Sequence, residues 1–356
     1  MFWLIPGTAC FIVTYILSTL LGKVLISKNT ELSDYQFKKD PYIYIFLMLA
    51  LGIISVSFIP PAFQNAITPL KISQIIGAFC FSALIYLLFL FETNKLLNFS
   101  ILSLSILSAF LFLNPDSLLL SKTISPSIER LIVGIILAGF VFSAKTLIGL
   151  PGIFSCFVIV FSSGLAIIAL AGGLPIYILL VATLVLGVAT SLFQSNRFDF
   201  YLKTNEGSLM SFFFLLGSLL LIGINEFAAP SVLILMTYPL SELIWCLIAQ
   251  YILRRKSPDL YVHATYFVAY KKETDLTAVQ GFVFKIGVIN GALSLFQLYS
   301  PNIFTLPFLT FLINFWLISK LYNVEQPIPT LNQANTQLIQ NIKDEITNVK
   351  QNFKKD

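Results

Sequence analysis

The sequence predicts an all-α membrane protein that crosses the bilayer about eleven times. Hydrophobic residues make up 57% of the 356 residues and charged residues only 11%, whereas a soluble domain carries about 25% charged residues. A soluble core of this length cannot enclose so much apolar surface, so part of the surface is expected to face lipid. The number of apolar runs and the sidedness of the basic loops give the other two grounds for this fold class.

Each apolar run is long enough for a helix to cross the hydrocarbon core of a bilayer. Turn and charge signals, such as Pro60-Pro61 and Gly172-Gly173, separate the runs. The first run has no basic residues before it, which indicates a retained span and not a cleaved signal peptide. The predicted spans are residues 2–22, 41–60, 72–91, 97–113, 129–146, 152–171, 174–194, 208–225, 230–252, 278–298 and 302–320.

Basic residues are distributed unevenly among the loops. If the N-terminus is outside, only Lys71, Lys122, Arg130 and Lys285 of the 22 lysines and arginines fall outside the cytoplasmic loops and tail. Cytoplasmic loops carry an excess of Lys and Arg, and one missed span would blur this separation in the rest of the chain. The pattern predicts an odd number of spans in an N-out/C-in topology. Since the outer loops are short, the working surface is expected on the cytoplasmic side.

A polar linker follows the last span, so we predict a transmembrane domain at 1–323 and a cytoplasmic linker and tail at 324–356. Apolar residues recur at helical spacing in that tail, which predicts a C-terminal amphipathic helix. This helix either packs on the cytoplasmic loops or lies on the membrane surface, attracted by anionic lipid. The apolar residues are Leu338, Ile342, Ile346, Val349 and Phe353.

Metal-binding and disulfide patterns are scarce. The four cysteines lie inside apolar runs without CxxC spacing, which is typical of buried apolar side chains. His263 is the only histidine, which excludes a site with several histidines from one chain. Two ionisable residues lie inside spans, where charge is costly. Glu242 either extends toward the membrane surface, hydrogen-bonds to a neighbouring helix or has a function. Lys285 is expected to extend toward the membrane surface.

Two loops carry the residues most suited to bind an anion. Arg254, Arg255 and Lys256 follow the ninth span, where they either anchor the loop at the membrane or bind phosphate oxygens. Gly207 and Ser208 open the eighth span, and a helix N-terminus with free backbone N–H groups attracts anions. The alternative for Ser208 is a simple N-cap.

These two loops resemble motifs of one family of membrane enzymes. Asn-Glu-Gly-Ser at residues 205–208, before a long apolar run, looks like the family's Gly-Asp-x-Gly-Ser motif. Tyr-Pro-Leu-Ser-Glu at 238–242, Arg-Arg-Lys-Ser-Pro-Asp at 254–259 and His263 resemble its ordered Pro-x-x-Asp/Glu, Arg-Arg, Ser-Pro, Pro-Asp and His-x-His series. The chain thus resembles a divergent polyprenyl-phosphate N-acetylhexosamine-1-phosphate transferase of the phospho-N-acetylmuramoyl-pentapeptide transferase-like type, mainly over residues 140–320.

The resemblance implies transfer of a sugar 1-phosphate from a UDP-N-acetyl sugar to undecaprenyl phosphate, with release of UMP, in cell-wall or lipopolysaccharide synthesis at the bacterial inner membrane. Mg²⁺ would bridge the diphosphate and needs carboxylate ligands. The resemblance implies catalytic roles for Glu92, Asn205, Glu206 and His263, and a metal-binding role for Glu92, Asp199 and Glu206. It implies phosphate binding by Arg254, Arg255, Lys256, Gly207 and Ser208. Gly149 and Gly152 would form the turns of the loop that contains them.

Several acidic positions of the family carry other residues here. Ile148 and Pro151 take the acidic places of its Asp-Gly-x-Asp-Gly loop, Asn205 replaces a motif aspartate, and Thr265 replaces the second histidine. One acid of the family's Asp-Asp pair remains, as Glu92. An isoleucine cannot bind a cation, so most Mg²⁺ affinity is expected to be lost, while the glycines that the turns require remain.

Three functions remain open. The chain is a working transferase that uses Mg²⁺ and a rebuilt set of acids, namely Glu92, Asp199, Glu206 and Asp259. Alternatively, it is an inactive relative that needs no cofactor and binds a lipid phosphate, a nucleotide sugar or a partner subunit, which could be a second copy of the chain. The third alternative is a multi-pass transporter or flippase, against which the scarcity of polar residues in the spans argues. No nucleic-acid partner is expected.

Overall fold

The structure of the chain is a computed structural model that describes residues 8, 11–12, 69–91, 94–113, 124–148, 150, 152–197, 206–224, 228–252, 260–271, 276–300 and 305–322. The chain divides into two compact units, Met1–Tyr322 and Asn323–Asp356. The predicted tail helix lies outside the described residues. So do the first two predicted spans, apart from three residues of the first.

The described residues from 69 onward form helices without any strand. Each predicted apolar run from residue 72 onward falls on one long helix. Among the described residues, three short helical turns lie between the long helices: the 3₁₀ turn η2 (Ala144–Thr146), the π-helical turn η3 (Ile248–Ile252) and the 3₁₀ turn η4 (Leu260–His263). The helices are α4 (Pro69–Phe91), α5 (Asn94–Phe112), α6 (Pro126–Ser143), α7 (Ile153–Leu170), α8 (Ile176–Arg197), α9 (Glu206–Gly223), α10 (Ala229–Leu247), α11 (Thr265–Lys271), α12 (Leu276–Tyr299) and α13 (Leu306–Tyr322).

Six helices of the described part are long and apolar enough to cross a membrane: α6 with η2, α7, α8, α9, α10 with η3, and α12. Shorter apolar helices cover Ser73–Phe89, Leu97–Phe112 and Leu306–Lys320. The chain is therefore a polytopic helical membrane protein. The count of about eleven spans and the N-out/C-in topology remain predictions.

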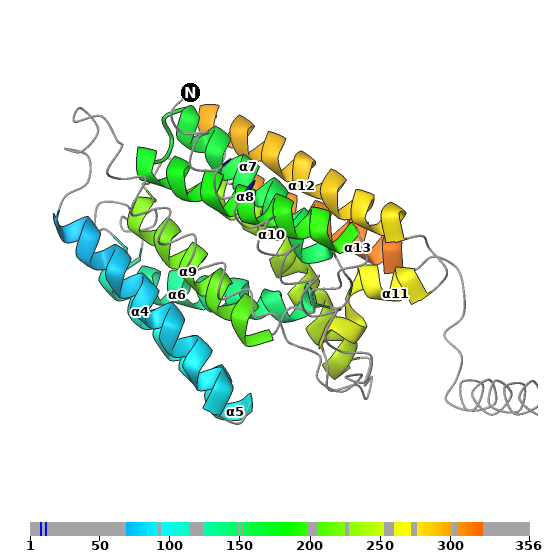
Figure 1. Cartoon of the computed structure of the whole chain (residues 1–356), viewed down its shortest axis with the longest axis horizontal. Coiled ribbons are helices and arrows are strands. Elements are labelled where there is room, and N and C mark those ends of the chain that lie inside the picture. The colour runs from blue at the N-terminus through cyan, green and yellow to red at the C-terminus, as the bar shows by residue number, and fades with distance from the viewer. Residues whose placement is uncertain are drawn as a thin grey trace, which may run out of the picture. The chain divides into compact units, whose positions relative to one another are not determined.

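Helix α9 occupies the interior of the bundle. Every residue from Gly207 to Gly223 is buried, as expected for a helix that is apolar all round. It packs along α4, with further contacts to α5 and α6 (Figure 1). The Phe213 ring lies 4.7 Å from the Phe140 ring and 5.8 Å from the Phe157 ring, centroid to centroid, which ties α9 to α6 and α7.

Helix α12 shows which face of the bundle meets lipid. Its outward residues include Phe284, Val288 and Phe296, each about half exposed. Its inward stripe ends in three polar residues, Asn290, Ser294 and Gln297. A soluble protein would place these two sets the other way round, whereas lipid favours an apolar exterior. Lys285 is exposed on α12.

Several helix ends meet around η2. This turn packs against α9, α10 and η4, and α7 begins a few residues after it. Helix α10 runs toward η2, since Glu242 in its second half contacts Thr265 just after η4. Contacts of Gly152 with Gln280 and of Gly287 with Val160 show that α7 and α12 start together and run in parallel. We call the end formed by η2, η4 and the first turn of α9 the η2 end.

Gly152 caps the start of α7 in a left-handed conformation, with φ of 81°. A Cβ atom here would also lie 2.6 Å from Nε2 of Gln280. The prediction that a glycine-dependent turn occurs here agrees with this geometry, while Gly149 lies outside the described residues.

Gly152→Ala is therefore expected to destabilise the protein by about 1–2 kcal/mol, because a side chain disfavours the left-handed region. Thermal unfolding in detergent measures this loss. Gly281→Ala is the matched control, since a Cβ atom at Gly281 in α12 would meet no neighbouring side chain within 4 Å. Equal midpoints for the two variants would contradict the role given to the Gly152 turn.

Candidate functional site

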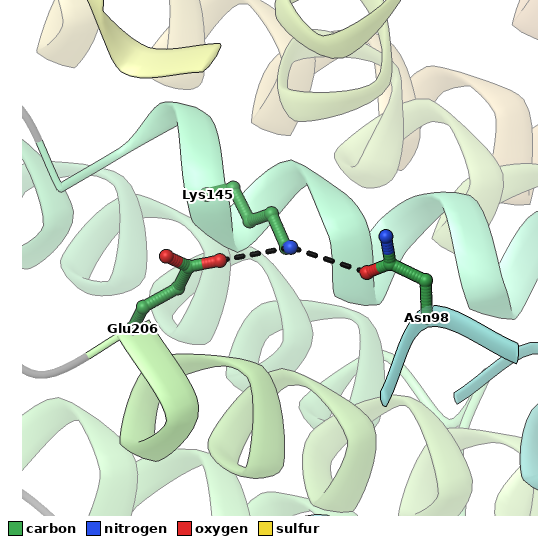
Figure 2. A network of polar contacts seen from close by, with 3 residues as sticks. All are labelled: Asn98, Lys145 and Glu206. Atoms are coloured by element: carbon green, nitrogen blue, oxygen red, sulfur yellow. Dashed lines mark hydrogen bonds and ion pairs between the residues drawn. The ribbon is translucent and has the colours of Figure 1, made fainter. Parts of the chain in front are cut away.

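A lysine and a glutamate meet at the η2 end. Lys145 Nζ lies 2.9 Å from Glu206 Oε1 and donates a hydrogen bond to Asn98 Oδ1 at 3.2 Å (Figure 2). The three residues come from η2, α9 and α5, so the contact joins three segments that are distant in the sequence. The Lys145 side chain is 14% exposed and that of Glu206 is 38% exposed. A ligand can therefore reach the carboxylate more easily than the ammonium.

The first turn of α9 lies directly beside this ion pair. Glu206 is the first helical residue, and its negative charge complements the positive end of the helix dipole. Gly207 and Ser208 are buried, and Ser208 Oγ has no hydrogen-bond partner among the described residues. The N-cap alternative for Ser208 was wrong, because Glu206 and Gly207, which precede it, are already helical.

Glu242 in α10 forms a second polar cluster at the η2 end. Its side chain is fully buried and accepts three hydrogen bonds. Thr265 donates from its backbone N–H at 3.2 Å and from Oγ1 at 2.5 Å, and Tyr238 OH donates at 3.3 Å. This arrangement favours the hydrogen-bonding interpretation of Glu242, because its lone pairs hold the start of α11 against α10.

The Glu242 cluster is linked to the Lys145 cluster through neighbouring residues. Tyr266 follows Thr265, and its hydroxyl donates to the carbonyl of Thr146, next to Lys145. His263 lies in η4, is buried and has interactions of its own. Segment η2, which carries Lys145, is therefore held in place from both α9 and α11.

The structure places some of the predicted site residues and leaves others out. Glu206, Gly207, Ser208 and His263 lie at the η2 end, and Gly152 opens α7 nearby. Phe89, near the end of α4, also lies beside Gly207. The predicted residues outside the described part are Glu92, Gly149, Asp199, Asn205, Arg254, Arg255, Lys256 and Asp259.

The described residues of this site are a poor fit for Mg²⁺. No group of three His, Cys, Asp or Glu side chains that could hold a metal occurs among them. Among the described acids at the η2 end, Glu206 is partly exposed, and its Oε1 lies 2.9 Å from the Lys145 ammonium. Mg²⁺ prefers several oxygen ligands in octahedral geometry, and a nearby cation repels it.

Sequence reasoning missed three residues of this site. In the sequence Lys145 is one of many basic loop residues, although it stands three residues before the loop at 148–152 that matches a family motif. Asn98 gives no signal, because a single Asn at the start of an apolar run is common. Thr265 stands where the family has a histidine and so indicates lost chemistry, whereas its hydroxyl and N–H bind Glu242.

Comparison with known proteins adds no family to this description. No protein-family model matches the chain. No curated protein matches it either.

Proposed function

We propose that this chain binds the phosphate of a polyprenyl phosphate or of a nucleotide sugar at the η2 end of its membrane-spanning bundle. In this proposal it is a divergent relative of the sugar-1-phosphate transferases it resembles, in a bacterial inner membrane, with about eleven spans and the η2 end on the cytoplasmic side. The observation that carries the proposal is the position of Lys145, a cation held at the first turn of α9.

Lys145 and the helix start offer complementary features for a phosphate. The ammonium has three N–H donors, and Glu206 and Asn98 occupy two of them. The first turn of α9 has backbone N–H groups without intrahelical acceptors, which favour a negative charge at that end. The predicted cations Arg254, Arg255 and Lys256 would add charge in the adjoining loop.

Glu206 acts as an internal competitor for the phosphate in this proposal. Its carboxylate already binds the Lys145 ammonium, to which a phosphate would have to bind. Because its side chain is more than a third exposed, the ion pair contributes at most about 1 kcal/mol. A phosphate with higher charge can therefore displace Glu206 from Lys145.

The direct test uses the purified full chain in lipid nanodiscs. Binding of undecaprenyl phosphate is measured by native mass spectrometry, with undecaprenol as the control that lacks the phosphate. Stronger retention of the phosphate lipid supports the proposal, and equal retention of both lipids contradicts it. The nucleotide sugars are tested by thermal stabilisation in the same sample, with uridine as their control.

Substitutions at the ion pair give opposite expected effects on binding. Lys145→Met is expected to weaken phosphate binding by about 1.5–3 kcal/mol, roughly tenfold to a hundredfold, since it removes a charge-assisted hydrogen bond. Glu206→Gln is expected to tighten binding, because it removes the competitor. Lys320→Met is the matched control, since Lys320 lies over the Trp316 ring in α13. Unchanged binding in Lys145→Met would refute the site.

A transferase is the second candidate, favoured by the partly exposed Glu206 carboxylate, which uses only Oε1 toward Lys145 (Figure 2). Catalysis would also need the predicted acids Glu92 and Asp199. The assay combines undecaprenyl phosphate, Mg²⁺ or Mn²⁺ and a panel of UDP-N-acetyl sugars, and measures UMP. In this case Glu206→Gln abolishes UMP release, in contrast to its effect on binding. Folded protein that binds the lipid and releases no UMP would exclude the transferase.

A further inference from the structure

A column of buried polar side chains lies inside the bundle between α10, α12 and α13. At its centre, Thr237 Oγ1 accepts hydrogen bonds from Asn314 Nδ2 at 2.8 Å and from Asn290 Nδ2 at 3.4 Å. The same hydroxyl donates to the carbonyl of Ile234 at 2.6 Å. The three helices therefore meet through amide and hydroxyl groups in a region that is otherwise apolar.

The column continues along α12 beyond this centre. Asn290, Ser294 and Gln297 lie on the inward stripe, at positions i, i+4 and i+7, and are at most 2% exposed. Among the described residues, Asn290 Oδ1, Ser294 Oγ and Gln297 Oε1 have no hydrogen-bond partner. The same holds for Ser231 Oγ in α10, which is fully buried.

The unpartnered atoms lie at adjoining levels of α10 and α12, which pack against each other. Helix α10 runs toward the η2 end and α12 runs away from it, so Thr237 and Asn290 mark a common level. Ser231 is about 9 Å further along α10, and Ser294 and Gln297 are about 6 Å and about 10 Å further along α12, at 1.5 Å per residue. Gln297 Nε2 donates to the carbonyl of Ser300 at 3.3 Å, where α12 ends. The column thus extends to the end of α12 opposite the η2 end.

The hydrogen-bonding groups of the column indicate which kind of ligand it can bind. Two amide carbonyls need hydrogen-bond donors, and two hydroxyls need a donor, an acceptor or both. None of the column's own side chains is charged, so an anion would lack a cationic partner and a divalent cation would lack a carboxylate. A buried carbonyl without a partner costs about 1–3 kcal/mol, and buried water molecules typically satisfy about three such groups each.

We propose that the column formed by Ser231, Asn290, Ser294 and Gln297 binds a chain of water molecules, which enters from the end of α12 opposite the η2 end. The site is distinct from the phosphate site and does not depend on it. The four side chains of the column are neutral, so the distribution of charged residues in the sequence does not indicate these polar groups inside the bundle.

X-ray hydroxyl-radical labelling with mass spectrometry tests this proposal in the full chain in nanodiscs. Radicals form from water, so a buried thiol is oxidised quickly only where water lies beside it. Ser294→Cys places a near-isosteric thiol in the column. Native Cys156, which is 4% exposed among the apolar residues of α7, is the internal control in the same molecule.

The introduced thiol is expected to be oxidised severalfold faster than Cys156. Adding Asn290→Leu and Gln297→Leu should bring its rate down to that of Cys156, because both amide acceptors are then gone. Equal rates in the single variant would overturn the proposal. Fast oxidation of Cys156 itself reports unfolding, in which case Ser231→Cys gives the same comparison from α10.

Discussion

Glu242→Leu is expected to give one of the largest losses of stability in this protein. The substitution removes the acceptor of three buried hydrogen bonds and leaves the Thr265 N–H, the Thr265 hydroxyl and the Tyr238 hydroxyl unsatisfied. At about 1 kcal/mol or more for each orphaned donor, the free energy of unfolding should fall by about 3 kcal/mol or more. Fluorescence-detected thermal unfolding in detergent is the measurement, and the midpoint should fall by about 6 °C or more.

Two further variants separate the hydrogen bonds from simple packing. Glu242→Gln keeps one carbonyl acceptor and the side-chain volume, so it should lose clearly less stability than Glu242→Leu. Adding Thr265→Val to Glu242→Leu removes one orphaned hydroxyl and should recover part of the loss, which a double-mutant cycle detects. Strictly additive effects of Glu242→Leu and Thr265→Val would contradict the contact. A stable Glu242→Leu variant would leave a functional role as the alternative for this residue.

The helices of the bundle could be predicted from the sequence because lipid leaves few choices. A run of about 20 apolar residues must satisfy its own backbone hydrogen bonds, so it forms a helix. The predicted runs at 152–171 and 208–225 accordingly match α7 and α9 within a few residues. The sequence did not predict that α9 is enclosed while α12 is half exposed, since both are apolar and their burial depends on which helices pack around them.

The candidate site was harder to predict because its contacts join distant segments. Glu206 and Ser208 were singled out from a local motif, whereas the Lys145–Glu206 pair spans sixty-one positions of the chain. Thr265 shows a second difficulty. As a replacement for a histidine it indicated lost chemistry, yet its small hydroxyl lets it reach the Glu242 carboxylate at 2.5 Å. Such compensation depends on distances that no motif encodes.

Gly207→Ala is the second substitution with a large expected effect. The family resemblance gives Gly207 a role in binding phosphate, whereas the structure gives it a role in packing. A Cβ atom at this position would lie 2.2 Å from Cγ of Phe89, far inside van der Waals contact. Since Gly207 is buried on α9 where this helix contacts α4, the helices would have to separate or Phe89 would have to change its rotamer. The expected loss is about 1–3 kcal/mol, as for overpacked cores.

Thermal unfolding of Gly207→Ala and of a matched variant decides between packing and binding. Gly291→Ala is the control, because Gly291 in α12 has open space around a Cβ position and alanine gains up to about 1 kcal/mol in helix propensity over glycine. The control should therefore be as stable as the natural chain or more stable. Adding Phe89→Leu to Gly207→Ala should recover part of the loss, because a smaller side chain gives the new methyl group room. If Gly207→Ala instead keeps the unfolding midpoint of the natural chain and loses only phosphate binding, the close approach of α4 to α9 is not the reason a glycine is required at this position. In that case the backbone of the first turn of α9 contacts the ligand directly.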